Sequence, residues 1–284
     1  MSHRIRALIG VALGFYMGAI WARGRAIGHP QEWQHFKRVH RGFIKKIPEL
    51  DVIAKGLLTE QPTANTDARS LVFLLGCLCL QDYRELFLLC ANGYGIAAAK
   101  VLRSLYEHAV TAQHIARHPE NAPLFNEYTH VEHSKLLRHA EETLTPENYA
   151  RLFTDDQKQR AEEEYERVRA HYKGQKSWSP LNLRDMAIRD GEGLEMFYSL
   201  CFAHPSSHVH ATARGLYSRI AQQSGRIIFQ AGPQRQEASD ALHLGTIAFL
   251  FSLRTQARTF SPSVEQELLA LAPKILSDWE PAKG

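Results

Sequence analysis

The fold is decided by residues 97–116, AAAKVLRSLYEHAVTAQHIA. Apolar side chains recur here at the three- and four-residue spacing of an α-helix that buries one broad face. Arg103, Glu107 and His108 interrupt this apolar run. Because an unpaired charge is costly to bury, these side chains need partners in the fold or a role in function. They are the first candidates for a functional site.

On a helical wheel, Arg103, Glu107 and His114 fall on the polar face opposite the apolar arc. Arg103 and Glu107 are four residues apart and can form an intrahelical ion pair. His108 lies about 140° from Arg103, near the edge of the apolar arc. A site that uses both Arg103 and His108 would need a bent helix or a second subunit, and we expect a homodimer. The alternative is a plain ion pair and a histidine at the edge of the core.

Helical periodicity continues along the rest of the chain, which predicts an all-α, multi-helix bundle with at most a short strand pair near residues 226–232. The length of 284 residues allows one or two domains. With 44% hydrophobic and 23% charged residues, the composition excludes a disordered chain. We expect a basic N-terminal helical arm or membrane anchor over residues 1–60 and the helical bundle domain over residues 61–284.

Turn and capping residues set the expected helix limits. A helix that begins at Pro30 should reach about residue 60, with an interruption near Pro48. Further helices are expected over residues 71–90, 96–117, 119–143, 145–172, 184–190, 194–203, 236–258 and 264–279. Pro205 should break the helical run, and Ser206 or Ser207 should cap the next helix.

The net charge of +4 hides an asymmetry. Residues 1–46 contain nine Lys and Arg side chains against a single acidic residue, Glu32, so this end carries +8 and the remaining residues carry −4. Such a basic end indicates an anionic neighbour, which is nucleic acid, a lipid surface or the acidic part of the same protein.

Residues 7–22 form a run of sixteen residues without a charge, flanked by two arginines on each side. A membrane-spanning helix needs about 20 apolar residues, so the run is slightly short. Gly10, Gly14 and Gly18 recur every four residues, a spacing seen where membrane helices pack closely. We expect a cytoplasmic protein, with anchoring to a membrane through residues 7–22 as the alternative. A buried soluble helix would also explain the pattern.

The four cysteines form no C-x-x-C pair, and three of them lie in apolar helical sequence. They are Cys77, Cys79, Cys90 and Cys201. We therefore expect buried free thiols in a reducing compartment.

A second polar cluster lies at residues 203–210, AHPSSHVH. A helix that starts at the two serines would offer free backbone N–H groups to a phosphate or a carboxylate. We expect His210, at the start of that helix, to lie within hydrogen-bond reach of Arg103 and Glu107, because one shared network would satisfy all three side chains. Ordinary capping with one buried histidine is the alternative.

Glu127 and His130 form a Glu-x-x-His motif, which places both side chains on one helix face as in di-iron bundles. A complete di-iron site needs two such motifs and two more glutamates, and the sequence has one motif. A metal-dependent helical enzyme that uses Glu107, Glu127, His130 and His210 is therefore an alternative. The main expectation includes no metal and no cofactor.

Residues from about 70 to 220 resemble a bacterial family of helical proteins of unknown function. The matching pieces are Arg103-Ser-Leu-Tyr-Glu107, Phe125 to Tyr128, Leu183-Arg-Asp-Met-Ala187, Tyr198, Ser206 to His210 and Gly215. Arg-x-x-x-Glu and Ser-x-x-Val-His are the recurrent polar marks of that family, and His210 is the matching histidine. The resemblance implies an all-α bundle with a shared polar pocket, and no known activity.

The spacing Arg103-x-x-x-x-His108, with Ser104 after the arginine, also resembles the signature of the HEPN superfamily, whose helical bundles include metal-independent ribonucleases. The resemblance implies that His108 or His210 takes the proton from a ribose 2′-hydroxyl. Arg103 would hold the scissile phosphate, and Glu107 would orient the arginine.

The predicted function is a HEPN-like RNA-cleaving or nucleotide-binding protein in phage defence or stress, with RNA or a nucleotide as partner. The expected catalytic residues are Arg103, Glu107, His108 and His210, and the expected ligand-binding residues are Tyr128, Ser206, Ser207 and His114. A non-catalytic interaction protein, anchored through residues 7–22, is the alternative from another class.

Overall fold

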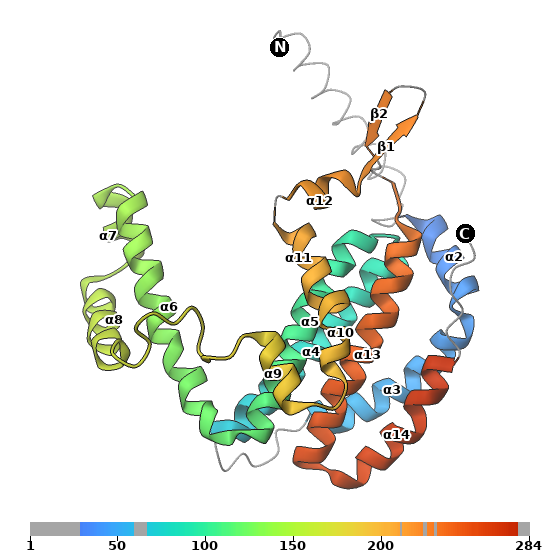
Figure 1. The fold of residues 1–284 in the computed structure, drawn as a ribbon, viewed down its shortest axis with the longest axis horizontal. Coiled ribbons are helices and arrows are strands. Elements are labelled where there is room, and N and C mark those ends of the chain that lie inside the picture. The colour runs from blue at the N-terminus through green and yellow to red at the C-terminus, as the bar shows by residue number, and fades with distance from the viewer. Residues whose placement is uncertain (1–28, 60–66, 211, 224–225, 230–231, 278–284) are drawn as a thin grey trace.

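The structure is a computed structural model that describes residues 29–59, 67–210, 212–223, 226–229 and 232–277. It is mostly helical, which confirms the predicted all-α class (Figure 1). In these ranges, no helix is long and apolar enough to cross a membrane. The charge-free run 7–22 lies outside the described residues.

Three long helices form the centre of the bundle: α4 (Asp67–Ala91), α5 (Gly95–Arg117) and α13 (Arg235–Phe260). They lie side by side in Figure 1 and make the most extensive contacts with one another. A tight turn joins α4 to α5, and Gly93 in that turn has a φ of 76°, which glycine adopts at little cost. Residues 97–116 are thus the central helix of the fold.

Aromatic side chains fill the space between the central helices. The ring of Tyr83 on α4 stacks on the ring of Phe249 on α13, with 4.4 Å between their centroids. Tyr106 on α5 is fully buried, and its hydroxyl donates a hydrogen bond of 2.8 Å to the carbonyl of Leu194. Burial of such large side chains supplies most of the driving force for packing.

Helices α2 (Pro30–Val39), α3 (Arg41–Leu58) and α14 (Pro262–Ser277) pack on one side of the central helices. Phe43 and Leu50 of α3 belong to the main hydrophobic core. Much of the segment expected to form a separate arm therefore shares the core of the bundle.

The interruption expected near Pro48 is wrong. Helix α3 passes through Pro48, and the chain bends instead at His40, between α2 and α3. A proline inside a helix costs about 3 kcal/mol through a lost hydrogen bond and a steric clash. Burial of Phe43, Leu50 and Leu57 on one face of α3 offsets that cost.

Helices α6 (Ala122–Thr143), α7 (Pro146–Leu152) and α8 (Asp155–Val168) form an arm that extends away from the central helices (Figure 1). A short 3-10 turn, Pro119–Asn121, leads into it. Its own small core consists of Tyr128, Val131, Val168 and Tyr172. Trp178 packs against this core and against the main one, so it connects the arm to the bundle.

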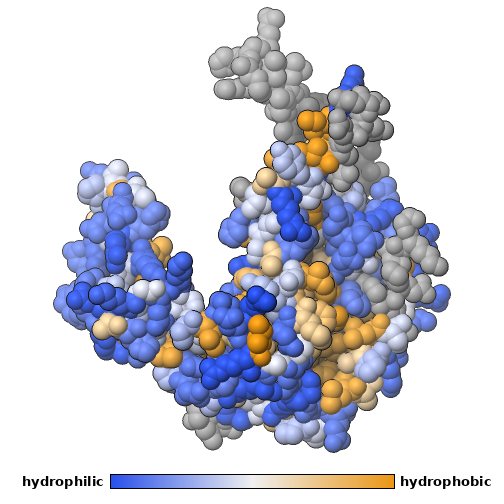
Figure 2. Space-filling model, viewed as in Figure 1, coloured by the Kyte–Doolittle hydropathy of each residue, from blue (hydrophilic) through white to orange (hydrophobic). Residues whose placement is uncertain are grey.

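The single helix expected over residues 145–172 is two helices, α7 and α8. Thr154 separates them because its side chain accepts a hydrogen bond from the backbone N–H of Gln157, whose side chain accepts one from the backbone N–H of Thr154. This reciprocal capping box starts a new helix. The face of the arm that Figure 2 shows is mostly hydrophilic.

The chain returns to the bundle through α9 (Leu183–Asp190), α10 (Leu194–Tyr198), a π-helical turn (Ser199–Ala203) and α11 (His204–Val209). Pro205 was expected to break the helical run, and this is wrong. The π-helical turn leads directly into α11, and Pro205 is the second residue of that helix. A wider turn tolerates the missing N–H of proline.

A short helix and a hairpin follow. Helix α12 (Ala213–Tyr217) is capped by the side chain of Thr212, not by a serine of α11. Strands β1 (Ile220–Gln223) and β2 (Arg226–Phe229) pair antiparallel, which confirms the expected short strand pair and extends it to residue 220.

The cysteines are free thiols, as predicted, with Cys79, Cys90 and Cys201 buried and Cys77 half-buried. Burial raises the pKa of Cys79 and of Cys201 to about 12. These thiols are protonated at neutral pH and belong to the core.

Hydrophobic residues also reach the surface. Figure 2 shows them gathered over α10, α13 and α14, on the side of the bundle away from the arm. Met196, Leu200 and Leu269 are among the exposed members.

Gly95 lets α5 and α13 pack closely, so a substitution at this position tests their packing. A Cβ atom at Gly95 would lie 2.4 Å from the backbone nitrogen of Ala238, whereas one at Gly56 in α3 would meet nothing within 4 Å. We expect Gly95→Ala to lower the free energy of unfolding by about 1–3 kcal/mol, because α5 and α13 must move apart. Gly56→Ala should raise it by about 0.5–1 kcal/mol. Urea denaturation measures both, and equal effects would contradict the packing described here.

Candidate functional site

The side chain of Arg103, on α5, extends to α11. Its Nε donates a hydrogen bond of 3.0 Å to the hydroxyl of Ser206, and its guanidinium lies 4.4 Å from the ring centroid of Phe202. Its Nη1 atom is 3.5 Å from Oε2 of Glu107, so the two side chains form the expected intrahelical pair. The structure therefore brings together Arg103, Glu107 and Ser206.

His210 does not join this group. It is exposed at the C-terminal end of α11, whereas the sequence suggested the start of a helix. The cause is the continuous helix around Pro205, which places Ser206 and Ser207 inside α11. Their hydroxyls donate to the carbonyls of Phe202 and His204 and cap no helix. The expected convergence of His210 with Arg103 is absent among the described contacts.

His108 faces a different helix from Arg103, as the wheel predicted. Its Nδ1 lies 2.9 Å from Oδ2 of Asp82 on α4. A single chain therefore does not bring Arg103 and His108 into one site. Tyr128 lies farther away still, in the core of the arm, where its hydroxyl accepts a hydrogen bond from Lys135.

The ligands of the alternative metal site do not converge either. Glu107 pairs with Arg103, Glu127 accepts a hydrogen bond from Arg167, and His130 lies 3.6 Å from Glu164. In the part of the chain that the structure describes, a different set brings three potential ligand atoms within 4.8 Å of one another: His114, His118 and Asp190.

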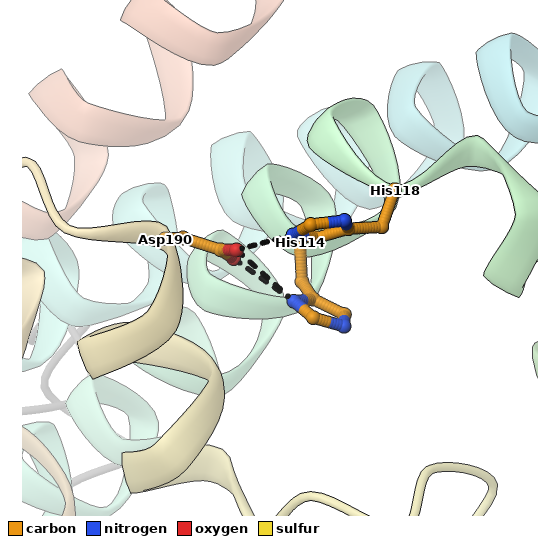
Figure 3. Close-up of side chains that lie close together, drawn as sticks. All are labelled: His114, His118 and Asp190. Atoms are coloured by element: carbon orange, nitrogen blue, oxygen red, sulfur yellow. Dashed lines mark hydrogen bonds and ion pairs between the residues drawn. The ribbon is translucent and has the colours of Figure 1, made fainter.

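These three residues form a compact cluster, shown in Figure 3, which we call the histidine–aspartate cluster. His114 Nδ1 lies 3.0 Å and 3.2 Å from the two carboxylate oxygens of Asp190. His118 Nε2 lies 3.1 Å from Asp190 Oδ1. The side chains of His114 and Asp190 are 1% exposed, and that of His118 is 23% exposed.

Local structure positions the cluster. His114 and His118 are four residues apart at the C-terminal end of α5, so both face α9. Asp190 is the last residue of α9, which Gly191 ends with a φ of 69°. Gln113 donates a hydrogen bond of 3.3 Å to the carbonyl of Gly191 and thereby fixes the turn against α5.

A pocket of about 660 Å³ opens beside the same turn. Its charged and polar lining includes Arg69, Arg117, Arg254, Arg258, Glu192 and Gln113. Val72, Ile115 and Phe251 are among its apolar lining residues. We call it the arginine pocket, because its lining contains four arginines and one carboxylate.

Two carboxylates hold three of these arginines in place. Glu192 pairs with Arg117, lies 3.2 Å from Nη1 of Arg254 and accepts bonds of 2.5 Å from Arg258. Glu265 on α14 accepts bonds of 3.0 Å from Arg254 and 2.6 Å from Arg258. Burial alone would raise the pKa of Glu265, but these hydrogen bonds keep it below its ordinary value.

The backbone at Glu192 is strained. Among the described residues, it is the one non-glycine residue with a positive φ, at 70°. Such a conformation costs about 1–3 kcal/mol, is uncommon for residues other than glycine, and recurs at functional sites. Its place between the histidine–aspartate cluster and the arginine pocket makes this end of α5 the candidate functional site.

This end of α5 lies within a stretch of the chain that matches a known protein family. Residues 69–227 match a family of unknown function, DUF5677. The chain belongs to this family. The match begins in the first turn of α4, ends in β2 and spans more than half of the chain. It confirms the expected membership of a family without known activity. The HEPN resemblance finds no support there.

No protein of curated function and no solved structure matches the chain. The DUF5677 match contains Arg69, Arg117 and Glu192 of the arginine pocket, and it contains the whole histidine–aspartate cluster. Arg254 and Arg258 lie on α13, beyond the matched residues.

The sequence pointed to His114 but not to its partners. The spacing of His114 and His118 was the available local signal, because residues four apart share a helix face. Asp190 is 76 residues from His114 and carries no motif. The arginine pocket is likewise assembled from separate helices, so no short sequence window contains it.

Removal of the Asp190 carboxylate tests how much the histidine–aspartate cluster stabilises the fold. In the presence of a chelator, Asp190→Ala should lower the free energy of unfolding by about 2–4 kcal/mol, because two histidines lose their shared buried acceptor. Asp185→Ala, an exposed position on the same helix, should cost less than about 1 kcal/mol. Guanidinium denaturation measures the difference, and similar values for both variants would contradict it.

Proposed function

We propose that this DUF5677 protein binds a phosphate-bearing ligand, a nucleotide or a short RNA segment, in the arginine pocket. The observation that carries the proposal is the charge of the lining. Arg117, Arg254 and Arg258 are held by the two carboxylates of Glu192 and Glu265, so this group carries a net charge of +1, and Arg69 is a fourth arginine in the lining. A net positive pocket of this kind attracts and retains anions.

The arginines suit phosphate in particular. A guanidinium presents several N–H donors in a planar fork that matches two oxygens of a phosphate group. Arg117, Arg254 and Arg258 are 42%, 28% and 38% exposed, so each still has donors that reach solvent. Their pairing with Glu192 and Glu265 fixes their positions before a ligand arrives, which lowers the entropy cost of binding.

The rest of the pocket fits the organic part of such a ligand. Val72, Ile115 and Phe251 provide an apolar wall. The volume of about 660 Å³ lies within the range of about 300–1,000 Å³ that is typical of small-molecule sites. A phosphate near the arginines and a base or other apolar group on this wall would use both parts of the lining.

The competing explanation is a salt-bridge network that joins α5, α13, α14 and the turn at Glu192 and binds nothing. Such a network explains the pairs of Arg117, Arg254 and Arg258, but it requires no pocket and no excess of positive charge. Affinity for phosphate compounds distinguishes the two explanations.

Binding to the full chain is measured by titration with inorganic phosphate, ATP, GTP and a short RNA at low and at physiological salt. We expect saturable binding of at least one phosphate compound, weakened by salt. Arg117→Gln and Arg258→Gln should each weaken it about tenfold or more, since each removes a charge-assisted hydrogen bond.

Arg167→Gln is the matched control, because Arg167 is also held by two carboxylates, Glu127 and Glu164, but lies on the arm. It should change the affinity less than about twofold. Absence of binding to every compound at low salt would overturn the proposal, as would equal effects of Arg258→Gln and Arg167→Gln.

A second candidate function is RNA cleavage at His108, and one observation favours it. Asp82 lies 2.9 Å from Nδ1 of His108, with 27% of the His108 side chain exposed. A carboxylate on Nδ1 orients a histidine and leaves Nε2 available as a general base. Arg103 faces another helix, so a cleavage site with both residues needs the second subunit of the predicted homodimer.

RNA cleavage is tested with the full chain and a single-stranded RNA in EDTA. If His108 is the general base, His108→Ala should reduce the rate at least 100-fold, and Asp82→Asn should reduce it by a smaller factor. His130→Ala should leave the rate unchanged, because His130 also pairs with a carboxylate but lies on the arm. No cleavage by the unaltered chain, or equal cleavage by His108→Ala, would exclude this candidate.

A further inference from the structure

We infer that the histidine–aspartate cluster is a binding site for one divalent transition-metal ion of the Zn²⁺ or Fe²⁺ type. His114, His118 and Asp190 each offer one ligand atom, and these atoms lie within 4.8 Å of one another. Two imidazoles and one carboxylate form a common protein ligand set for both ions, with the remaining positions left to water or a ligand. The inference stands apart from phosphate binding in the arginine pocket.

The spacing of the three side chains fits an ion. Ligand atoms that surround an ion tetrahedrally at about 2.1 Å lie about 3.4 Å from one another. One oxygen of Asp190, Oδ1, already lies 3.2 Å from His114 Nδ1 and 3.1 Å from His118 Nε2. Shifts of a few tenths of an ångström would open these two edges to the required length. Figure 3 shows both rings directed at the same carboxylate.

Partners on the far side of each ring strengthen the inference. The side-chain amide of Asn121 lies 3.2 Å from His114 Nε2, and Glu120 Oε1 lies 3.5 Å from His118 Nδ1. Metal-binding histidines usually donate their second N–H to a carboxylate, carbonyl or amide oxygen, which fixes the tautomer and the ring. A rotation of the Asn121 amide presents its oxygen to His114 Nε2, and Glu120 is an acceptor for His118 Nδ1.

The burial of Asp190 favours the binding of a cation, and the partial exposure of His118 lets the ion reach the cluster. The carboxylate of Asp190 is 1% exposed, and an anion at such depth is stabilised strongly by a nearby cation. His118, at 23% exposed, forms the solvent side of the cluster, so an ion can approach without unfolding α5 or α9. The C-terminal end of α5 adds negative potential at the same place.

Zn²⁺ and Mg²⁺ are the two probes of the test. The full chain is treated with EDTA, dialysed and titrated calorimetrically with each ion. We expect one Zn²⁺ per chain and a higher melting temperature with Zn²⁺, because the ion binds the folded state alone. Mg²⁺ should not bind the cluster, since it prefers six oxygen ligands.

The decisive variant is His118→Ala, because this half-buried position tolerates truncation better than His114 or Asp190. It should weaken Zn²⁺ binding at least 100-fold through the loss of one of three ligands. Asn121→Ala should weaken it about 10–100-fold, an effect that a purely structural role of Asn121 would not produce. His130→Ala is the matched control and should leave the affinity unchanged.

Bound Co²⁺ provides a second readout through its visible absorption, which depends on the ligands of the ion. The spectrum should be lost in His118→Ala and kept in His130→Ala. Zn²⁺ bound by scattered surface histidines would survive His118→Ala unchanged, and that result would overturn the inference. Absence of stoichiometric Zn²⁺ binding would overturn it as well, whatever the outcome with phosphate compounds.

Discussion

The position of α5 at the centre of the bundle is the constraint on which the other features depend. The helix is surrounded by α4, α13, α9 and α11, so most of its surface is inside the protein. Close approach is possible because Gly95 leaves room for the backbone of α13. On a helix enclosed in this way, a polar side chain that is buried must find a hydrogen-bond partner inside the protein.

The partners are distributed along the helix. Arg103 contacts Ser206 of α11, His108 contacts Asp82 of α4, and His114 contacts Asp190 of α9. Each contact satisfies a polar group that burial would otherwise penalise, and each also sets the position of the neighbouring helix. The polar side chains of α5 therefore specify the arrangement of the bundle as well as the candidate sites.

The C-terminal end of α5 differs from the other two places because more polar groups meet there. Two histidines share the carboxylate of Asp190, which is 1% exposed. Three arginines gather around Glu192, whose backbone is held in an unfavourable conformation. Retained backbone strain beside a cluster of ionisable groups is a common feature of functional sites.

Sequence reasoning succeeded where the deciding interaction is local. Helical periodicity predicted the all-α class, and spacing within α5 predicted both the Arg103–Glu107 pair and the separation of His108 from Arg103. It failed where packing overrules a local signal. Pro48 lies inside α3 because the buried face of that helix outweighs the cost of the proline, and Pro205 continues a helix through a π-helical turn.

The candidate site could not be predicted from the sequence for the same physical reason, because packing of separate helices brings its residues together. Asp190 and Glu192 become partners of α5 only when the turn after α9 packs against it, and Arg254 comes from α13. No property of a short window distinguishes these residues from surface charges. His210 shows the opposite error, because a motif gave it prominence that its exposed position at the end of α11 does not support.

The two parts of the site meet at one turn, because Glu192 follows Asp190 by two residues. An anion in the arginine pocket would use the guanidinium donors that still reach solvent, while Glu192 and Glu265 hold the same side chains in place. Displacement of Glu192 would release a strained residue two positions from Asp190. A ligand that displaced this turn would also shift Asp190, and by reciprocity an ion that held Asp190 in place would then change the affinity of the pocket.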